Sequence, residues 1–393
     1  MKGQGSMRKT FVEIDLKQLG KNVKEVIKSY PDYKYVIGVL KSDAYGHGVE
    51  VVKTMKDNGV NYVAVSYFHE ALKVRELDED IPILCMQPIE LQNVEEASLK
   101  HITLTVHDLN YLKDLMQVSL NRKLKIHLKI DSGMSRLGFQ DKESVVTAKK
   151  LISESPYLEL EGIYTHFATV GFFDKHWDDQ LASFQEITSL IDLGEIPIVH
   201  LASSTIMLAH SKISFANGVR LGILLYGYNV SPYFSKDGVK NKLRVVRNDF
   251  YQKKYRISDT YTNISLAVAP AFRMYTYILQ IKTIAKGSFV GYGATYEAKK
   301  EMKIAILPIG YANGIASKYV LIHGKRYNVV GEISMNMMMI EVDDEVSLDD
   351  VVVVLGDEIT LGLMSRWKNA GLAESLLDIG NSNERVYVEE KRM

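Results

Sequence analysis

The sequence predicts an α/β protein: a (β/α)₈ TIM barrel followed by a mostly β C-terminal domain. Between residues 33 and 227, eight short apolar runs alternate with segments of helical period. Near-continuous apolar strands separated by helices indicate a parallel sheet covered by helices. Eight such units in about 200 residues favour a closed barrel over an open sheet. Beyond residue 265 closely spaced strand-like runs replace this alternation.

The chain divides into four parts. Residues 1–10 are interpreted as a tail or a tag remnant, and residues 11–230 as the barrel domain. A strand at 11–16 precedes the barrel count and fits either domain. The barrel strands are expected near 33–41, 62–67, 81–87, 101–106, 124–131, 158–165, 196–202 and 219–227.

The C-terminal part of the chain has a different texture. Residues 231–264 are polar and aperiodic, which predicts an insertion or linker. Residues 265–393 predict the β domain, with one or two short helices near 362–378.

Composition excludes several classes of protein. The 48 basic and 48 acidic residues cancel, which argues against a nucleic-acid binder and a polybasic membrane surface. No apolar run approaches the roughly 18 residues of a membrane span, and the N-terminus lacks a signal peptide. Cys85 is the single cysteine, so no intrachain disulfide or cysteine-rich metal site is expected, and we predict a reducing, cytoplasmic location without a bound metal.

Polar residues stand where the predicted barrel strands end, which is where barrel enzymes place their active sites. Taken singly, a lysine there is usually a solvated charge, a histidine a structural residue and an arginine half of an ion pair. Their common position at one rim favours a site. Walker, GxGxxG, GxSxG and HExxH motifs are absent. The candidates are Lys41, Lys129, Arg136, His166, Ser203, Ser204 and Arg220.

Several motifs resemble, in order, the alanine racemase family of fold-type III pyridoxal-phosphate enzymes. They are FVEIDLKQLGKNV, VLKSDAYGHG, HLKIDSGMSRLGF, GIYTHFA, VRLGILLYG, VGYGATYEA, PIGYANG and the triplet SMN. The match runs from about residue 11 to 390, interrupted mainly by 231–264. It implies pyridoxal 5'-phosphate as cofactor and a homodimer in which the β domain contributes to the partner's active site.

The resemblance also implies roles for individual residues. Lys41 resembles the lysine that forms a Schiff base with the cofactor, and Tyr292, from the partner subunit, the second catalytic base. Arg136 resembles the arginine that orders this tyrosine and the substrate carboxylate, and Lys129 a lysine that is carbamylated in many members. Other cofactor-binding positions are Tyr45, Ser204, Gly222 and Ile223 for the phosphate and His166 and Arg220 around the pyridine ring; Tyr311 and Met335 match the substrate entrance.

Racemisation explains these residue types, because a base must stand on each face of the substrate Cα. Unperturbed lysine and tyrosine have pKa values near ~10.4 and ~10, so their neighbours must tune both. An arginine at the pyridine nitrogen keeps that nitrogen unprotonated and weakens the ring as an electron sink, which favours a racemase over a transaminase.

Two departures from the family pattern bear on the substrate. Asn336 follows Met335 where an aspartate is usual, and Asn381 stands at the position of a substrate-pocket tyrosine. Both changes suit a hydroxymethyl side chain better than a methyl, because they add hydrogen-bonding amides and space. The pattern resembles the cytoplasmic racemase domain of membrane-bound vancomycin-resistance serine racemases.

We therefore expect a racemase of serine, alanine or both that supplies D-amino acid for peptidoglycan precursors, either cytoplasmic or as the cytoplasmic domain of an anchored protein. One alternative is an ordinary biosynthetic alanine racemase. Others are a non-catalytic pyridoxal-phosphate barrel, which Tyr292 argues against, and a decarboxylase, which would need a cysteine in the C-terminal domain.

Overall fold

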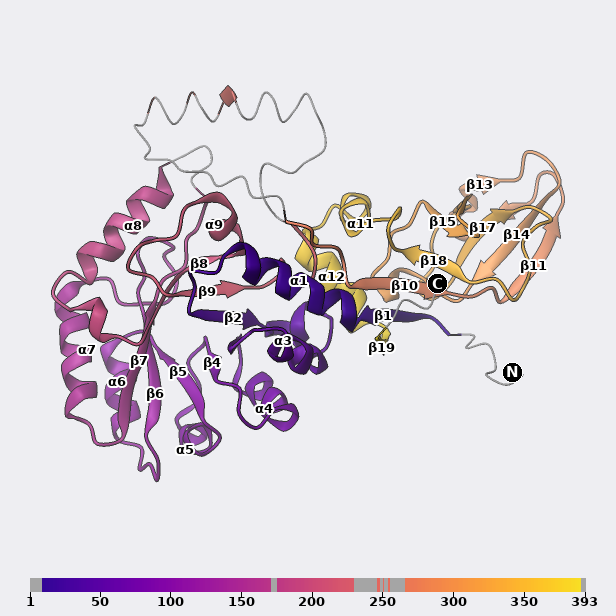
Figure 1. Cartoon of the computed structure of the whole chain (residues 1–393). Helices are drawn as coiled ribbons and strands as arrows, with labels where there is room; N and C mark the ends of the chain where they lie inside the picture. The colour runs from indigo at the N-terminus through magenta and orange to yellow at the C-terminus, as the bar shows by residue number, and fades with distance from the viewer. Residues whose placement is uncertain are drawn as a thin grey trace. The chain divides into compact units, whose positions relative to one another are not determined.

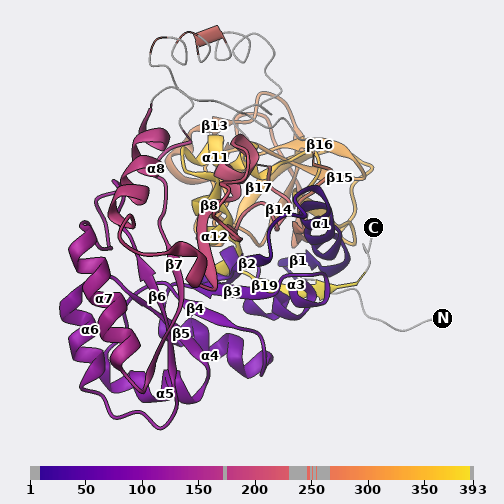
Figure 2. The same cartoon turned by 60° about the vertical axis from the view of Figure 1, so that its left-hand side comes forward.

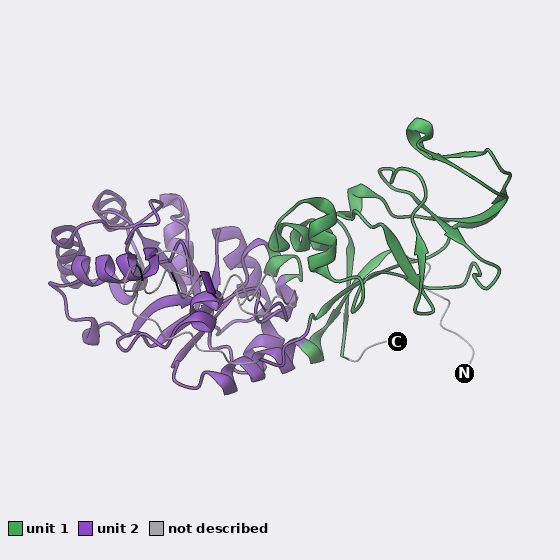
Figure 3. Ribbon diagram, turned by 90° about the horizontal axis from the view of Figure 1, so that it is seen from above, with its two compact units in different colours: residues 1–18, 43–48, 270–393 green, residues 19–42, 49–269 purple. Residues whose placement is uncertain are grey.

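A computed structural model of the chain describes residues 9–170, 175–229 and 266–389, together with residues 246, 247, 250 and 254. The predicted insertion at 231–264, apart from these four residues, and most of the predicted tail lie outside the described residues. The chain forms two compact units (Figure 3). Unit 1 comprises residues 1–18, 43–48 and 270–393, and unit 2 comprises residues 19–42 and 49–269.

Unit 2 contains a closed barrel of parallel strands, which confirms the predicted fold (Figures 1 and 2). The barrel closes where the first strand pairs with the last, with Tyr35 opposite Gly218. The strands are β2 (Tyr35–Val39), β3 (Tyr62–Val65), β4 (Ile83–Cys85), β5 (Ile102–Val106), β6 (Leu124–Lys129), β7 (Leu158–Tyr164), β8 (Ile198–Ser203) and β9 (Gly218–Leu221).

Helices follow the strands along the chain and lie outside them (Figure 2). Side-chain caps fix where two of them begin: Asp108 accepts from the Tyr111 N–H at 2.8 Å, and Asp141 from the Ser144 N–H at 2.7 Å. The helices are α1 (Leu16–Ser29), α3 (Val52–Asp57), α4 (Phe68–Leu77), α5 (Val94–Leu99), α6 (Leu109–Met116), α7 (Lys142–Glu154), α8 (His176–Ile187) and α9 (Ser204–Ala209).

The last barrel strand is shorter than the predicted 219–227. After Leu221 the chain enters a turn, although Leu224, Leu225 and Tyr226 remain buried. The Tyr226 hydroxyl donates to the Val39 carbonyl at 3.0 Å. An apolar run alone does not distinguish a strand from a buried turn, and here the turn packs the same residues into the barrel.

The described part of unit 1 is mostly β, as predicted, and includes helices near its C-terminal end. Strand β1 (Phe11–Asp15) belongs to this unit rather than to the barrel domain in which residues 11–230 were placed, because it pairs antiparallel with β10 and parallel with β19. The six-stranded sheet has the order β16-β15-β18-β10-β1-β19, and a three-stranded sheet has the order β11-β14-β17.

The other elements of unit 1 are β10 (Phe272–Thr276), β11 (Gln280–Ile284), β12 (Phe289–Val290), β13 (Tyr296–Glu297), β14 (Met302–Leu307), β15 (Tyr319–Ile322), β16 (Lys325–Asn328), β17 (Met338–Val342), β18 (Val352–Leu355), β19 (Glu384–Val388), α11 (Leu361–Lys368) and α12 (Leu372–Asn381). Helix α2 (Lys41–Tyr45) begins in unit 2 and continues into unit 1. Among the described residues, no helix has the length and apolar character needed to cross a membrane. No metal-binding group of three or more His, Cys, Asp or Glu side chains occurs in that part of the chain.

Candidate active site

Lys41 is the first residue of α2 and follows the C-terminal end of β2. The next four residues, Ser42 to Tyr45, have φ angles of 54° to 55°. They form a left-handed turn without a glycine, in which each residue costs about 1–2 kcal/mol relative to the right-handed form. Such strain persists only where the surroundings hold it, and it is concentrated at functional sites.

In unit 1, the turn is held by both backbone and side-chain contacts. The N–H groups of Gly46 and Gly48 donate to the Asp43 carbonyl at 3.0 and 2.9 Å. Arg385 forms an ion pair with the Asp43 carboxylate at 2.5 Å, and the Tyr387 hydroxyl donates to the His47 carbonyl at 3.1 Å. The C-terminal strand β19 therefore supports the turn that follows Lys41.

A cluster of cations surrounds Lys41 in the barrel unit. Burial and the nearby Arg136 and Arg220 lower the pKa of Lys41, while Glu70 opposes them. Burial and the same two arginines lower the pKa of Lys129 to about 8. The Lys129 amine also lies 5.7 Å from the centre of the Tyr164 ring. Both lysines are therefore easier to deprotonate than free lysine, as proton transfer near neutral pH requires.

Arg220 is buried, and protein acceptors engage both of its terminal nitrogens. Nη2 donates to the Thr165 carbonyl at 2.7 Å and to Nδ1 of His166 at 3.2 Å. Because a guanidinium only donates, Nδ1 of His166 is unprotonated. Burial and Arg220 lower the pKa of His166 to about 3, so its ring is neutral. Burial lowers the pKa of Arg220 only to about 10, so it stays charged at neutral pH.

A chain of buried polar groups continues from Arg220 through the barrel, and its other members were not among the residues predicted from the sequence. Arg220 Nη1 donates to Nδ1 of His200 at 2.9 Å, which leaves the His200 proton on Nε2. That proton points to Nδ1 of His127 at 2.9 Å, and Nε2 of His127 then donates to Glu161 at 3.2 Å. Burial lowers the pKa of both histidines, so both rings are neutral. Their hydrogen bonds fix which nitrogen of each ring carries the proton.

Glu161 ends this chain as a carboxylate. Burial alone would raise its pKa, but hydrogen bonds from His127, Lys125 and Tyr62 outweigh burial and lower the pKa of Glu161 to about 2. Gly162 makes room for His127, because a Cβ there would lie 2.6 Å from two ring atoms. The two histidines and Glu161 lie within the predicted strands. Polar residues inside otherwise apolar strands were the feature of the sequence that could have indicated this chain.

The residues predicted to bind phosphate lie at the ends of β8 and β9, except Tyr45. Ser204 opens α9, and its hydroxyl accepts from the Gly222 N–H at 3.2 Å. Ile223 follows in the turn after β9. Hydroxyls and backbone N–H groups gathered at one rim are the donors that bind phosphate groups. Tyr45 belongs to unit 1, where burial raises its pKa to about 12.

The barrel residues therefore suit pyridoxal phosphate in their chemistry. They offer a lysine amine with a lowered pKa, a buried arginine that remains charged, a neutral histidine and polar groups suited to phosphate. Lys129 and Arg136 lie in the same cluster, since both act on the pKa of His166.

In unit 1, the predicted substrate residues Tyr311, Met335 and Asn336 share one neighbourhood. The N–H of Tyr311 donates to the Ser334 carbonyl at 3.1 Å, and the N–H of Ala312 to the Met335 carbonyl at 3.0 Å. This approach needs a glycine at 310, where a Cβ would lie 2.1 Å from the Ser334 oxygen. Tyr311, Met335 and Asn336 are all exposed in the chain alone.

Tyr292 lies in a glycine turn beside the same loop. Gly291 has φ 77°, and a Cβ there would meet the Glu332 backbone nitrogen at 3.1 Å. The Tyr292 side chain is 74% exposed, which is unusual for a large aromatic ring and leaves it open to a partner.

Asn381 is the last residue of α12 and is exposed. The helix end is tied to the Tyr311 turn, because Asn313 donates to the Asn383 Oδ1 at 2.8 Å. On the other side, a Cβ at Gly380 would lie 2.2 Å from the Gly46 oxygen, so α12 packs directly on the segment after Lys41. In unit 1, the Tyr311 turn therefore contacts the Ser334–Met335 backbone on one side and the residues just after α12 on the other.

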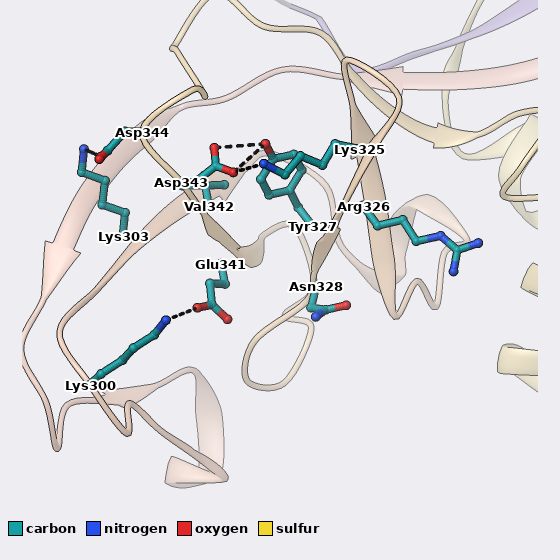
Figure 4. Close-up of a pocket in the computed structure, with 10 residues that line it drawn as sticks. All are labelled: Lys300, Lys303, Lys325, Arg326, Tyr327, Asn328, Glu341, Val342, Asp343 and Asp344. Atoms are coloured by element: carbon teal, nitrogen blue, oxygen red, sulfur yellow. Dashed lines mark hydrogen bonds and ion pairs between the residues drawn. The ribbon is translucent and has the colours of Figure 1, made fainter.

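A surface pocket of about 420 Å³ lies elsewhere in unit 1, on β14, β16 and β17 (Figure 4). It contains none of the predicted site residues. Its lysines are paired with carboxylates: Lys325 with Asp343 at 2.5 Å, and Lys300 with Glu341 at 3.8 Å. Lys303 pairs with Asp344 in the same way. We assign it no role in the site.

Comparisons with known proteins agree with this arrangement. The sequence model of the family "Alanine racemase, N-terminal domain" matches residues 14–230, and that of "Alanine racemase, C-terminal domain" matches residues 271–387. An alanine racemase of Methanococcus maripaludis is 35% identical over 364 residues, covering 89% of this chain and 90% of that protein.

Solved structures give the same result. The structure of alanine racemase from E. faecalis superposes with a TM-score of 0.83 at 28% identity, covering 98% of this chain and 99% of that one. A histidine racemase from Leuconostoc mesenteroides has a TM-score of 0.80 at 25% identity, covering 98% and 99% of the two chains. Together with the two matched domains, these likenesses show that the chain belongs to the alanine racemase family and is a pyridoxal-phosphate-dependent racemase.

Proposed function

We propose that this racemase interconverts the L- and D-forms of serine and alanine with two bases, Lys41 and Tyr292. The observation that carries the assignment is the position of Lys41, just after the end of β2, where burial and nearby cations lower its pKa. When bound, pyridoxal phosphate withdraws electrons from the substrate Cα and makes its proton acidic. Lys41 holds the cofactor and exchanges that proton on one face.

The surrounding residues bind and orient. Arg136 is an exposed residue whose guanidinium suits a substrate carboxylate, and its backbone N–H donates to Asp131 at 2.9 Å. Arg220 and His166 would bind the pyridine ring, with Arg220 held in place by the carbonyl of Thr165. Ser204, Gly222, Ile223 and Tyr45 bind the phosphate.

The opposite-face base is Tyr292 of the partner subunit, so the working unit is a homodimer. Support comes from the exposure of a cluster of large side chains around the Tyr292 turn. Phe289 is 64% exposed, Tyr292 74% and Met335 55%. Apolar side chains gathered on one face mark a protein interface, and a second copy of the chain is the partner that completes a two-base site.

Serine is proposed as a substrate because two asparagines lie on unit 1 near Tyr311. Asn336 and Asn381 each offer an amide donor and acceptor for a hydroxyl group. The histidine racemase among the structural relatives shows that this fold carries racemases for side chains other than methyl. Alanine is the second candidate, since the 35% identical relative is an alanine racemase. Beyond the reaction, we propose a supply of D-amino acid for peptidoglycan precursors in the cytoplasm, on the pattern of vancomycin-resistance serine racemases.

Two experiments test this proposal. Chiral analysis of products from L-serine and L-alanine, each run separately, is expected to show both D-amino acids. If serine is untouched while alanine is racemised, the chain is an ordinary alanine racemase. Lys41→Ala is expected to abolish the visible absorption of the bound cofactor, whereas the exposed control Lys53→Ala retains it. Survival of the band in Lys41→Ala would show that another residue holds the cofactor.

A further inference from the structure

A buried carboxylate lies against the residue that follows Lys41. Glu70 is in the first turn of α4 and is 6% exposed. Its Oε1 accepts the Ser42 N–H at 2.6 Å, and its Oε2 accepts the N–H groups of Ser66 and Tyr67 at 2.8 and 3.0 Å. One side chain thus joins the loops that follow β2 and β3.

The two carboxylate oxygens of Glu70 accept hydrogen bonds from different elements. The bond from Tyr67 is the capping-box bond from the N-cap amide to a glutamate at the third helical position, and the bond from Ser66 belongs to the same helix start. The bond from Ser42 serves another element, because Ser42 is the first residue of the left-handed turn. Residues in that conformation stay there only when neighbours hold them. The hydrogen bond from Ser42 therefore stabilises the backbone directly after Lys41.

We propose that Glu70 is a positioning residue for Lys41: its carboxylate fixes the Ser42 amide, so that the turn aims Lys41 into the cofactor site, and its charge favours the protonated lysine nitrogen. The inference rests on the proposed role of Lys41 as the cofactor lysine.

The charges around Lys41 support this role. Burial, Arg136 and Arg220 lower the pKa of Lys41, and Glu70 raises it. Lys129 belongs to the same cluster, where its free amine would add positive charge and a carbamate would not, while His166 is neutral. Among the charged groups that shift the pKa of Lys41, namely Arg136, Arg220 and Glu70, Glu70 is the negative one, so its removal shifts the balance on the lysine nitrogen.

The test is Glu70→Gln, which keeps the shape of the side chain but removes its charge. The holoenzyme is titrated with alkali while the visible absorption of the bound cofactor is followed. The expected midpoint lies lower by about half a pH unit or more, or roughly a threefold loss of proton affinity, because the protonated nitrogen loses an opposite charge. The rate at which cofactor is lost on dialysis is expected to rise as well.

The matched control is Asp141→Asn at the start of α7, where the carboxylate accepts the Ser144 N–H at 2.7 Å. It removes another helix-capping charge from the same barrel and is expected to leave the midpoint unchanged, because asparagine caps a helix about as well as aspartate. If Glu70→Gln behaves in the same way as this control, Glu70 is only a helix cap and the proposal fails.

A second variant keeps the test open if Glu70→Gln does not fold. Glu70→Asp retains the charge and stays near Ser66 and Tyr67, but it is one methylene too short to hold Ser42 as well. It is expected to lose cofactor faster than the wild type with little change in midpoint; wild-type retention would overturn the positioning role. Loss of the visible band in Lys41→Ala, together with unchanged Glu70 variants, would reject this inference alone. Survival of the band in Lys41→Ala would instead reject the proposed cofactor lysine.

Discussion

Lys129 is a lysine whose neighbours oppose its charge. Burial, Arg136 and Arg220 bring its pKa to about 8, which leaves about a tenth of the amine neutral at pH 7, against less than about 0.1% for a free lysine. Because this pKa lies below that of the unfolded chain, folded-state stability is expected to rise with pH from about 8 toward about 10.4, where the unfolded lysine also loses its proton.

A neutral amine reacts with dissolved carbon dioxide, and the resulting carbamate would turn the repulsion from both arginines into attraction. We therefore expect Lys129 to be carbamylated. With ¹³C-labelled bicarbonate, the holoenzyme is expected to show one carbamate resonance that is absent from Lys129→Ala. A resonance of equal intensity in the variant would assign the modification to another lysine.

The two asparagines of unit 1 are expected to set the ratio of serine to alanine turnover. Asn336→Asp and Asn381→Tyr should each lower kcat/KM for serine relative to alanine, because each removes an amide that can pair with the substrate hydroxyl. Recognition of a hydroxyl can reach ~10⁴-fold when a buried partner is left unpaired, and exposed asparagines should give far less.

The double variant is expected to behave as an alanine racemase, with effects that need not add, because both residues are proposed to contact the same substrate. Asn328→Asp, an exposed asparagine on β16, is the control and should leave the ratio unchanged. An unchanged ratio in the double variant would return the protein to the ordinary alanine racemase interpretation.

At the scale of single residues, the sequence predicted the polar side chains at the ends of the barrel strands. It did not predict the role of those that lie further inside the barrel. Lys129, His166 and Arg220 were candidates because they lie in or next to the terminal residues of predicted strands. His127, His200 and Glu161 lie within the strands, and only the closed barrel brings them into one chain of hydrogen bonds. Pairing between strands far apart in the sequence is a tertiary property that no local pattern encodes.

At the scale of elements, the turn that carries Tyr311 depends on Gly310. A Cβ at this position would lie 2.1 Å from the Ser334 oxygen and 2.3 Å from that of Met335, so Gly310→Ala must push the two loops apart. We expect kcat/KM to fall by about tenfold or more, since small misplacements of substrate-positioning groups are costly.

The control is Gly287→Ala, which has a φ of 84° and no atom within 4 Å of the new Cβ. It carries only conformational strain, of about 1–2 kcal/mol, and should lower Tm with activity retained. Equal activities of the two variants would show that the Tyr311 turn does not position substrate.

Element boundaries show the limits of local patterns. The eight barrel strands were predicted in the right order because buried parallel strands are apolar throughout. The segment at 222–227 was assigned to a strand for the same reason, although it is a buried turn. The left-handed turn after Lys41 had no signal at all, because Ser42 to Tyr45 contain no glycine and the conformation is imposed from outside.

At the scale of the whole molecule, the proposed shared site predicts complementation between inactive subunits. Tyr292→Phe keeps the ring and removes only the hydroxyl, and a loss of roughly 10²-fold or more is expected for an acid–base residue. Mixing Lys41→Ala with Tyr292→Phe under subunit exchange should restore activity, because one site of the hybrid then has both residues intact. Mixtures as inactive as their components would mean that Lys41 and Tyr292 serve one site from the same chain.

The division into two domains could be predicted because each domain has its own regular pattern of elements. Alternation of strands and helices predicted the barrel, and the later strand-rich texture predicted a β domain. The membership of β1 was left open, because its own sequence fits either domain. Its hydrogen bonds to β10 and β19 join the first described strand to the last, and such distant pairing has no local pattern.

The turn after Lys41 has a consequence for the protein's own stereochemistry. Four L-residues there adopt the backbone angles that their mirror-image counterparts prefer. A D-alanine at position 44 would adopt its preferred backbone conformation there, because the left-handed helical angles are the mirror image of those that L-residues prefer. It would avoid the contact between Cβ and the following carbonyl oxygen that makes these angles costly for an L-residue. The proposed active site, which would act on both enantiomers of its substrate, is thus built on a segment whose L-residues adopt the backbone conformation that D-residues would adopt at lower cost.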